Sequence, residues 1–98
     1  MLFIVQFEDK PDIGELRQKL MADHFKFLDS KKEQVLVAGS MREIPSDKPL
    51  GGLWIIEANS EAEVREIFRD DPFWTNNLRA SVRINRWVKA FPDRTTPV

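Results

Sequence analysis

The chain contains one histidine, His24, and imidazole is the side chain best suited to proton transfer near neutral pH. His24 lies within the segment Leu20–Leu28, where helical spacing places it on a stripe of apolar residues. The members of that stripe are Ile13, Leu16, Leu20, His24, Phe27 and Leu28. The position therefore has two interpretations, a hydrogen-bonded core histidine or an acid–base group, and the pattern alone favours the first.

Two further residues could act with a histidine, and each also has a simpler explanation. Asp71 precedes Pro72, so capping a short helix accounts for it without any chemistry. Arg17 precedes His24 by seven residues, on the same side of a helix, and could bind an anion. A solvated surface charge explains Arg17 equally well from the pattern.

The segment 81–90 alternates as a strand and gives a third group of candidates. One face carries Arg83, Asn85 and Trp87, which could line a pocket. A sheet edge turned to solvent would show the same pattern, so the sequence leaves both interpretations open.

Several kinds of site are not expected. Without cysteine there is no disulfide, thiol nucleophile or cysteine-built metal site, and a single histidine makes a metal site or a serine triad implausible. Gly51-Gly52 lacks the Lys-Ser/Thr sequence of a phosphate-binding loop. We therefore expect neither a metal nor a cofactor.

The composition indicates one soluble domain. The 98 residues are 42% hydrophobic and 32% charged, and 15 basic against 16 acidic residues give a net charge of -1. That balance argues against nucleic-acid binding, and no apolar segment is long enough to span a membrane. The first residues lack the basic region of a signal peptide, so we expect a cytoplasmic protein.

The first half of the chain predicts a strand, a helix and two more strands. An apolar strand covers residues 2–7, and a helix runs to about Lys32 from a capping box formed by Asp12 and Glu15. Further strands follow at 34–38 and 53–58, joined by a loop with two prolines.

The second half predicts two helical segments, a strand and a tail. Ser60 to Glu63 is a capping box, and Asp71-Pro72 predicts one more helical turn over 73–78. The last strand covers 81–90. We expect the domain to end at residue 91 and the segment 92–98 to be a flexible C-terminal tail.

The element order β-α-β-β-α-β predicts a ferredoxin-like α+β fold, a four-stranded antiparallel sheet with both helices on one face. The other face would be open to water, yet Leu2 and Ile4 in the first strand lie opposite Phe3 and Val5, so both faces are apolar. A second copy packed sheet against sheet would bury the open face. We therefore predict a homodimer that forms a dimeric α+β barrel.

Several short motifs, taken together, resemble the YCII-related family over residues 1–91. They are Arg17, His24-Phe25 and Phe27-Leu28 in the first helix, Val37-Ala38-Gly39-Ser40, Gly52-Leu53, Asp70-Asp71-Pro72-Phe73 and Arg86-Trp87. The combination of a histidine in the first helix with Asp-Pro-Phe at this spacing is the most specific part. The sequence departs from the family pattern at Phe25, where leucine is commoner, at Ser40, where proline is usual, and at Asn76-Asn77, near which glycine is frequent.

The resemblance implies a dimeric α+β barrel in which His24 and Asp71 are a catalytic pair in a cleft. Members of this family are mostly of unknown function, and one branch is a dehydrochlorinase acting on a chlorinated hydroxyhydroquinone. On this basis we expect a cofactor-independent lyase or isomerase acting on a small cyclic or carbonyl compound. Arg17, Ser40, Arg83 and Trp87 would bind the substrate.

A second hypothesis belongs to another class of protein. The chain would be a non-catalytic dimer that binds a small ligand or a partner protein, and His24 and Asp71 would be a buried structural pair. The two hypotheses differ in what they expect from substitutions of the pair, because breaking a structural pair should lower the melting temperature clearly.

Overall fold

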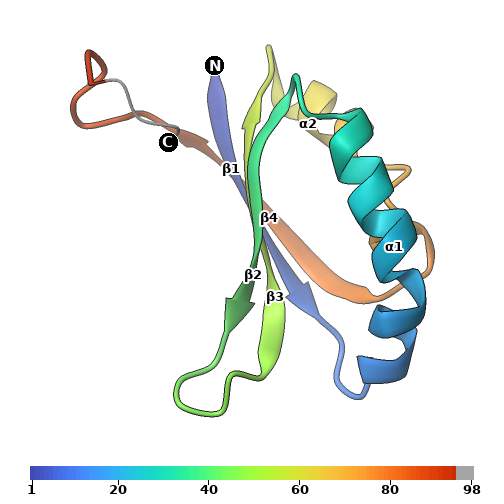
Figure 1. Ribbon diagram of the computed structural model, residues 1–98. Helices are drawn as coiled ribbons and strands as arrows, with labels where there is room; N and C mark the ends of the chain where they lie inside the picture. The colour runs from blue at the N-terminus through green and yellow to red at the C-terminus, as the bar shows by residue number, and fades with distance from the viewer. Residues whose placement is uncertain (95–98) are drawn as a thin grey trace.

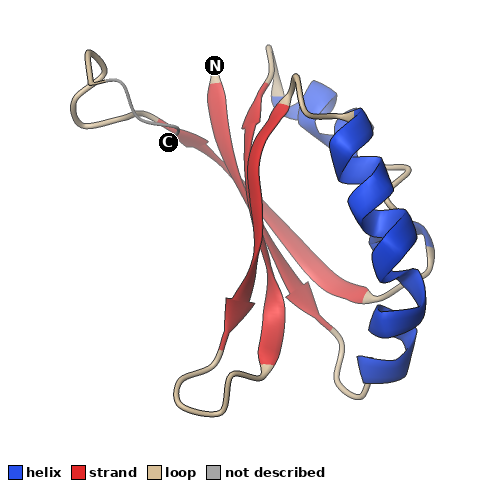
Figure 2. Ribbon diagram, viewed as in Figure 1, coloured by secondary structure: helices blue, strands red, loops and turns tan. Residues whose placement is uncertain are grey.

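The computed structural model describes residues 1–94 and contains four strands and three helices in these residues. In chain order they are β1 (Leu2–Asp9), α1 (Gly14–Ser30), β2 (Val35–Arg42), β3 (Pro49–Glu57), α2 (Glu61–Phe68), α3 (Pro72–Thr75) and β4 (Arg79–Trp87). The strands form one antiparallel sheet in the order β2-β3-β1-β4. The helices lie on one side of this sheet and leave the other side open (Figures 1 and 2). The predicted ferredoxin-like α+β fold is confirmed.

The core lies between the sheet and the helices. In β1 the buried side chains alternate, with Phe3, Val5 and Phe7 at most 7% exposed. Val5 pairs with Trp54 of β3 and with Ile84 of β4, so the buried face continues across the sheet. The helices complete the core with Val64, Ile67 and Phe68 from α2 and with the partly buried Phe27 and Leu28 from α1.

The helix α1 begins one residue later than its sequence predicts. Asp12 has a φ of 59°, a left-handed conformation that aspartate tolerates, and so belongs to the turn before the helix. Ile13 is the N-cap, without a side-chain cap, and its carbonyl accepts a bond from Arg17 N at 2.7 Å. The capping box predicted at Asp12 is therefore wrong, and the helix ends at Ser30 rather than near Lys32.

The two later caps agree with prediction. Ser60 Oγ accepts a hydrogen bond from Glu63 N at 3.1 Å and starts α2. Asp71 Oδ1 accepts one from Phe73 N at 3.2 Å and starts α3, with Pro72 in the first turn. Both signals are local in sequence, which is why they can be read without the fold.

The strands β2 and β3 are longer than predicted and form a hairpin whose tip spans residues 43–48. Ser40 therefore lies inside β2, opposite Gly52 of β3. Arg42 at the end of β2 donates to Ser40 Oγ at 3.1 Å and to the Asp47 carbonyl at 3.2 Å. These bonds tie the Arg42 side chain to the hairpin.

The C-terminal part is shorter in regular structure than predicted. The strand β4 ends at Trp87, before Ala90. The predicted tail 92–98 lies partly outside the described residues, so its flexibility and the domain end at residue 91 stay predictions. Within residues 1–94, no helix is long and apolar enough to cross a membrane.

Candidate active site

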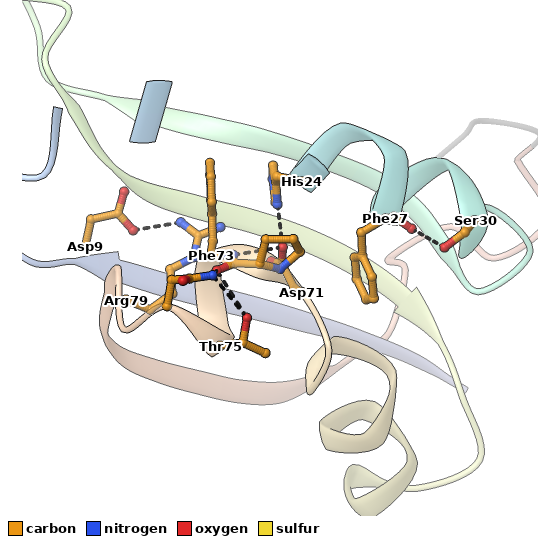
Figure 3. Close-up of polar contacts among 10 residues, drawn as sticks. Asp9, His24, Phe27, Ser30, Asp71, Phe73, Thr75 and Arg79 are labelled. Carbon is orange, nitrogen blue, oxygen red and sulfur yellow. Dashed lines mark hydrogen bonds and ion pairs between the residues drawn. The ribbon is translucent and has the colours of Figure 1, made fainter. Parts of the chain in front are cut away.

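His24 of α1 and Asp71 at the start of α3 form a buried pair across 47 residues of sequence. Their Nδ1 and Oδ1 atoms are 2.7 Å apart, and the side chains are 7% and 1% exposed. Figure 3 shows the His24 ring directed at the Asp71 carboxylate. The helical stripe that looked apolar in the sequence therefore carries a polar contact at its most buried position.

The carboxylate of Asp71 is held on one side only. Oδ1 also accepts the bond from Phe73 N, whereas Oδ2 is enclosed without a partner among the described residues. An enclosed and unpaired oxygen costs stability. A catalytic role is one recognised reason for such a group, and a bound water molecule is another.

The imidazole of His24 is fixed by aromatic contacts as well as by Asp71. The Phe73 ring stacks on it, with centroids 3.8 Å apart and planes 5° apart. Because Nδ1 faces Asp71, the other ring nitrogen, Nε2, is left for a ligand. Nε2 bonds to no described residue and is not among the enclosed unpartnered atoms, so it reaches the cavity that His24 lines.

That cavity has a volume of about 310 Å³, which is the size of a site for one small ring. It lies between α1 and the β2–β3 hairpin. Its lining is formed by Arg17, Met21, His24, Phe25, Leu28, Ala38, Gly39, Ser40, Arg42, Gly51, Gly52, Trp54, Phe73 and Arg79.

A larger hollow of about 600 Å³ lies elsewhere, lined by Gln6, Met41 and Arg83 among others. It contains neither member of the His24–Asp71 pair. We place the candidate site in the smaller cavity, because that one holds the titratable group with a fixed partner.

The structure brings four of the six predicted site residues together. Arg17 and Ser40 line the cavity with His24, and Asp71 lies behind His24. Arg83 and Trp87 do not join them. Arg83 pairs in register with Gln6 and donates to its Oε1 at 3.0 Å, and Trp87 pairs with Leu2, on the open face of the sheet. Their predicted substrate-binding role stays a prediction.

Two arginines of the cavity are absent from the sequence-based candidates. Arg42 ends β2 and Arg79 begins β4, and neither lies in a motif. Arg79 Nη1 donates to Asp9 Oδ1 at 2.7 Å, a contact between residues 70 positions apart. No spacing rule links such residues, so only the folded chain reveals them.

Burial lowers the pKa of the Arg17 guanidinium, and the positive charge of Arg42 lowers it further. Asp9 raises it, and Arg79 adds a smaller lowering effect. Among the residues that the structure describes, no three His, Cys, Asp or Glu side chains are grouped to hold a metal ion.

The fold and the site define a class: a small ferredoxin-like α+β protein with a buried His–Asp pair beside a cavity. The chain belongs to the YCII-related domain family, whose family model matches residues 1–88. No curated protein matches the chain.

Solved structures with this fold include one enzyme with a bound small molecule. It is 5-chloro-2-hydroxyhydroquinone dehydrochlorinase from Burkholderia phenoliruptrix AC1100 in complex with 2,5-dihydroxybenzoquinone, at 28% identity and a TM-score of 0.79 over 90% of this chain and 94% of that one.

Two further structures share the fold alone. A protein of Agrobacterium tumefaciens has 18% identity and a TM-score of 0.54 over 92% of this chain and 94% of its own. A conserved protein of Methanosarcina mazei Go1 has 19% identity and a TM-score of 0.54 over 90% and 91%.

Proposed function

We propose that this protein is a small cofactor-independent enzyme, a lyase or isomerase that uses His24 as general base and acid on a small cyclic or carbonyl compound. The observation that carries the proposal is the 2.7 Å contact between His24 Nδ1 and Asp71 Oδ1, which leaves Nε2 open to the cavity. The similarity to a dehydrochlorinase at 28% identity supports an enzyme-like role on small molecules.

In this mechanism Asp71 accepts a hydrogen bond from Nδ1–H, which keeps the lone pair on Nε2. Nε2 takes a proton from the substrate, and the carboxylate stabilises the imidazolium that results. The electron pair left behind forms a carbonyl, and on an aromatic ring the imidazolium returns the proton to the ring carbon that carries the leaving group. Nε2 then takes a second proton, and the leaving group departs from that carbon with its own bonding pair. No oxidant or reductant is consumed, because loss of a proton and a chloride removes HCl overall.

The alternative is a non-catalytic ligand-binding protein in which the pair has a structural role. The burial of both side chains favours it, since they are 7% and 1% exposed. The two functions make opposite predictions for turnover.

The test is chloride release from 5-chloro-2-hydroxyhydroquinone, the compound named for the enzyme at 28% identity. We expect turnover by the wild type and a loss of about 10²–10⁴ in kcat for His24→Asn and Asp71→Asn, the range of general acid–base catalysis. Asp70→Asn is the matched control, because it makes the same change at the neighbouring exposed carboxylate. Binding without chloride release by the wild type, or wild-type turnover by His24→Asn, would support the alternative.

We also propose that two copies pair through the open face of the sheet. Leu2, Ile4 and Leu53 are partly exposed on that side, around Ile55, which is only 3% exposed, and the helices leave this side open in Figure 1. Removing this apolar surface from water would stabilise a dimer by about 25 cal/mol per Å². In light scattering, Leu53→Glu should give a monomer, whereas Ile44→Glu, at a residue 92% exposed in the tip of the β2–β3 hairpin, should keep the mass of the wild type. A wild type that is monomeric at micromolar concentration would contradict this proposal.

A further inference from the structure

Three arginines from three elements converge on the cavity that contains His24. Arg17 comes from α1, Arg42 from the end of β2 and Arg79 from the start of β4. None of the residues that line the cavity is acidic. The lining of the cavity is therefore positively charged, although the net charge of the whole chain is -1.

Arg79 is the fixed member of this group. Its side chain is 4% exposed, and Nη1 donates to Asp9 Oδ1 at 2.7 Å. Its guanidinium carbon lies 4.6 Å from the Phe7 ring centroid and 5.0 Å from that of Phe73, so two rings hold the cation. Figure 3 shows Asp9, Arg79 and Phe73 side by side next to His24.

Arg79 retains donors that no described residue uses. Nε is enclosed and has no partner among residues 1–94. Nη2 also makes no hydrogen bond within this range, and it is not enclosed, so it faces the cavity that Arg79 lines. Gly52 leaves the space for it, since a Cβ at this position would lie 3.2 Å from Nη2.

Arg17 lacks a counter-charge of its own. Its side chain is half-buried and makes no hydrogen bond or ion pair with the residues described, whereas Arg42 is tied to Ser40 and Asp47. Burial lowers the pKa of Arg17, and so do the charges of Arg42 and Arg79, which repel it; Asp9 opposes this effect, but its carboxylate is bonded to Arg79. A bound anion would relieve this repulsion.

We propose that Arg17, Arg42 and Arg79 form an oxyanion-binding subsite, so that the substrate of this cavity is a small ring carrying one or more ionised oxygens, as in an enolate, phenolate or carboxylate. Arg17 and Arg42 contact the ligand from two walls, and Arg79 supplies a fixed donor between them and His24. The inference rests on the proposed function in locating the reacting ring beside Nε2. The volume of about 310 Å³ limits the ligand to about one ring.

Calorimetry with matched probes tests the subsite. 2,5-Dihydroxybenzoquinone, whose hydroxyl groups are vinylogous acids, and benzoate are the ionised ring probes, and 2,5-dimethoxybenzoquinone and benzamide are their neutral counterparts. Inorganic phosphate is an anion without a ring. The ionised ring probes should bind at least about tenfold more tightly than the neutral ones, the value of one charge-assisted hydrogen bond. Phosphate should bind more weakly than the ionised ring probes.

Variants then locate the binding. Arg17→Gln and Arg42→Gln should each weaken the ionised probes by about tenfold and leave the neutral ones unchanged. Arg69→Gln, which removes the same charge at an exposed position outside the cavity lining, should change neither. Arg17→Gln should also keep or raise the melting temperature, because it removes a repelled cation.

Equal affinity for ionised and neutral rings, no binding of any anion at millimolar concentration, or full anion affinity in both arginine variants would overturn the subsite. Tighter binding of phosphate than of the ring probes would overturn the proposal that the ligand is a ring.

A different result would contradict the proposed function. His24→Asn should retain anion binding while losing turnover, so lost anion affinity in the arginine variants together with unchanged turnover in His24→Asn would leave the subsite standing and remove the mechanism.

Discussion

Two buried pairs, each joining a nitrogen to a carboxylate, lie beside the ring of Phe73. In each pair a nitrogen and a carboxylate oxygen are 2.7 Å apart, in His24–Asp71 and in Arg79–Asp9. Phe73 stacks on His24 at 3.8 Å and lies 5.0 Å from the Arg79 guanidinium. The two pairs have nearly the same burial, so burial alone cannot explain what each one does.

The difference lies in which member can change its charge. Arg79 is a permanent cation between two aromatic rings, and Asp9 is its fixed counter-charge. His24 is charged only when protonated, and Asp71 keeps one oxygen that no described residue pairs with. The first pair can hold a charge in place, whereas the second can move a proton.

Removing the fixed counter-charge should have the largest effect. Asp9→Ala leaves the Arg79 cation buried without its partner, and we expect a loss of about 3–5 kcal/mol in the free energy of unfolding. Urea denaturation measures it, with Asp29→Ala at an exposed position of α1 as the matched control. A loss no larger than that of the control would mean that water replaces Asp9 without cost.

Removing both members of the His24–Asp71 pair should cost much less. Asp71→Ala alone should lower the free energy of unfolding by about 1–3 kcal/mol, since it takes a hydrogen bond from His24 and the cap from Phe73. The double variant His24→Leu with Asp71→Ser keeps a capping oxygen and removes the buried polar contact. We expect it to be within about 1 kcal/mol of the wild type, because replacing both partners avoids an unpaired group.

A double-mutant cycle with His24→Leu and Asp71→Ser as its single variants measures the interaction energy of the pair. A double variant whose loss equals the sum of the single losses would mean that no interaction energy couples the two side chains. A double variant that stays about as unstable as the less stable single variant would mean that the intact pair stabilises the fold, which favours the non-catalytic alternative.

The smallest effect is expected from an arginine on the other face of the same strand. Arg83 lies four residues after Arg79 in β4, and it is exposed and bonded to Gln6. Arg83→Gln should change the free energy of unfolding by no more than about 0.5 kcal/mol. It should leave ligand affinity in the His24 cavity unchanged when measured by calorimetry. A clear loss of affinity would bring the open face into the binding site.

The fold could be predicted from the sequence because its signals are local. Alternation in β1 and the caps at Ser60 and Asp71 depend on residues within a few positions of each other, and the structure agrees with them. The cap predicted at Asp12 fails for a related reason. The turn between β1 and α1 sets the left-handed backbone of Asp12, and the type of this residue alone does not predict that conformation.

The site could be predicted only in part. Periodicity placed His24 on the buried stripe of α1, and the family resemblance supplied Asp71 as its partner, which the 2.7 Å contact brings into reach. Alternation in β4 separated Arg83 and Trp87 from Val82 and Ile84. It could not say which set faces the helices, because a strand has two equivalent faces until the sheet packs.

The sequence by itself determined the elements, the buried stripe of α1 and the position of the one histidine on it. The tertiary structure alone decided that Arg42 and Arg79 share a cavity with Arg17, and that Arg83 does not. The physical reason is distance along the chain. Caps and periodicity act over a few residues. The contacts of His24 with Asp71 and of Arg79 with Asp9 join residues 47 and 70 positions apart, so they exist only after the sheet and helices have packed together.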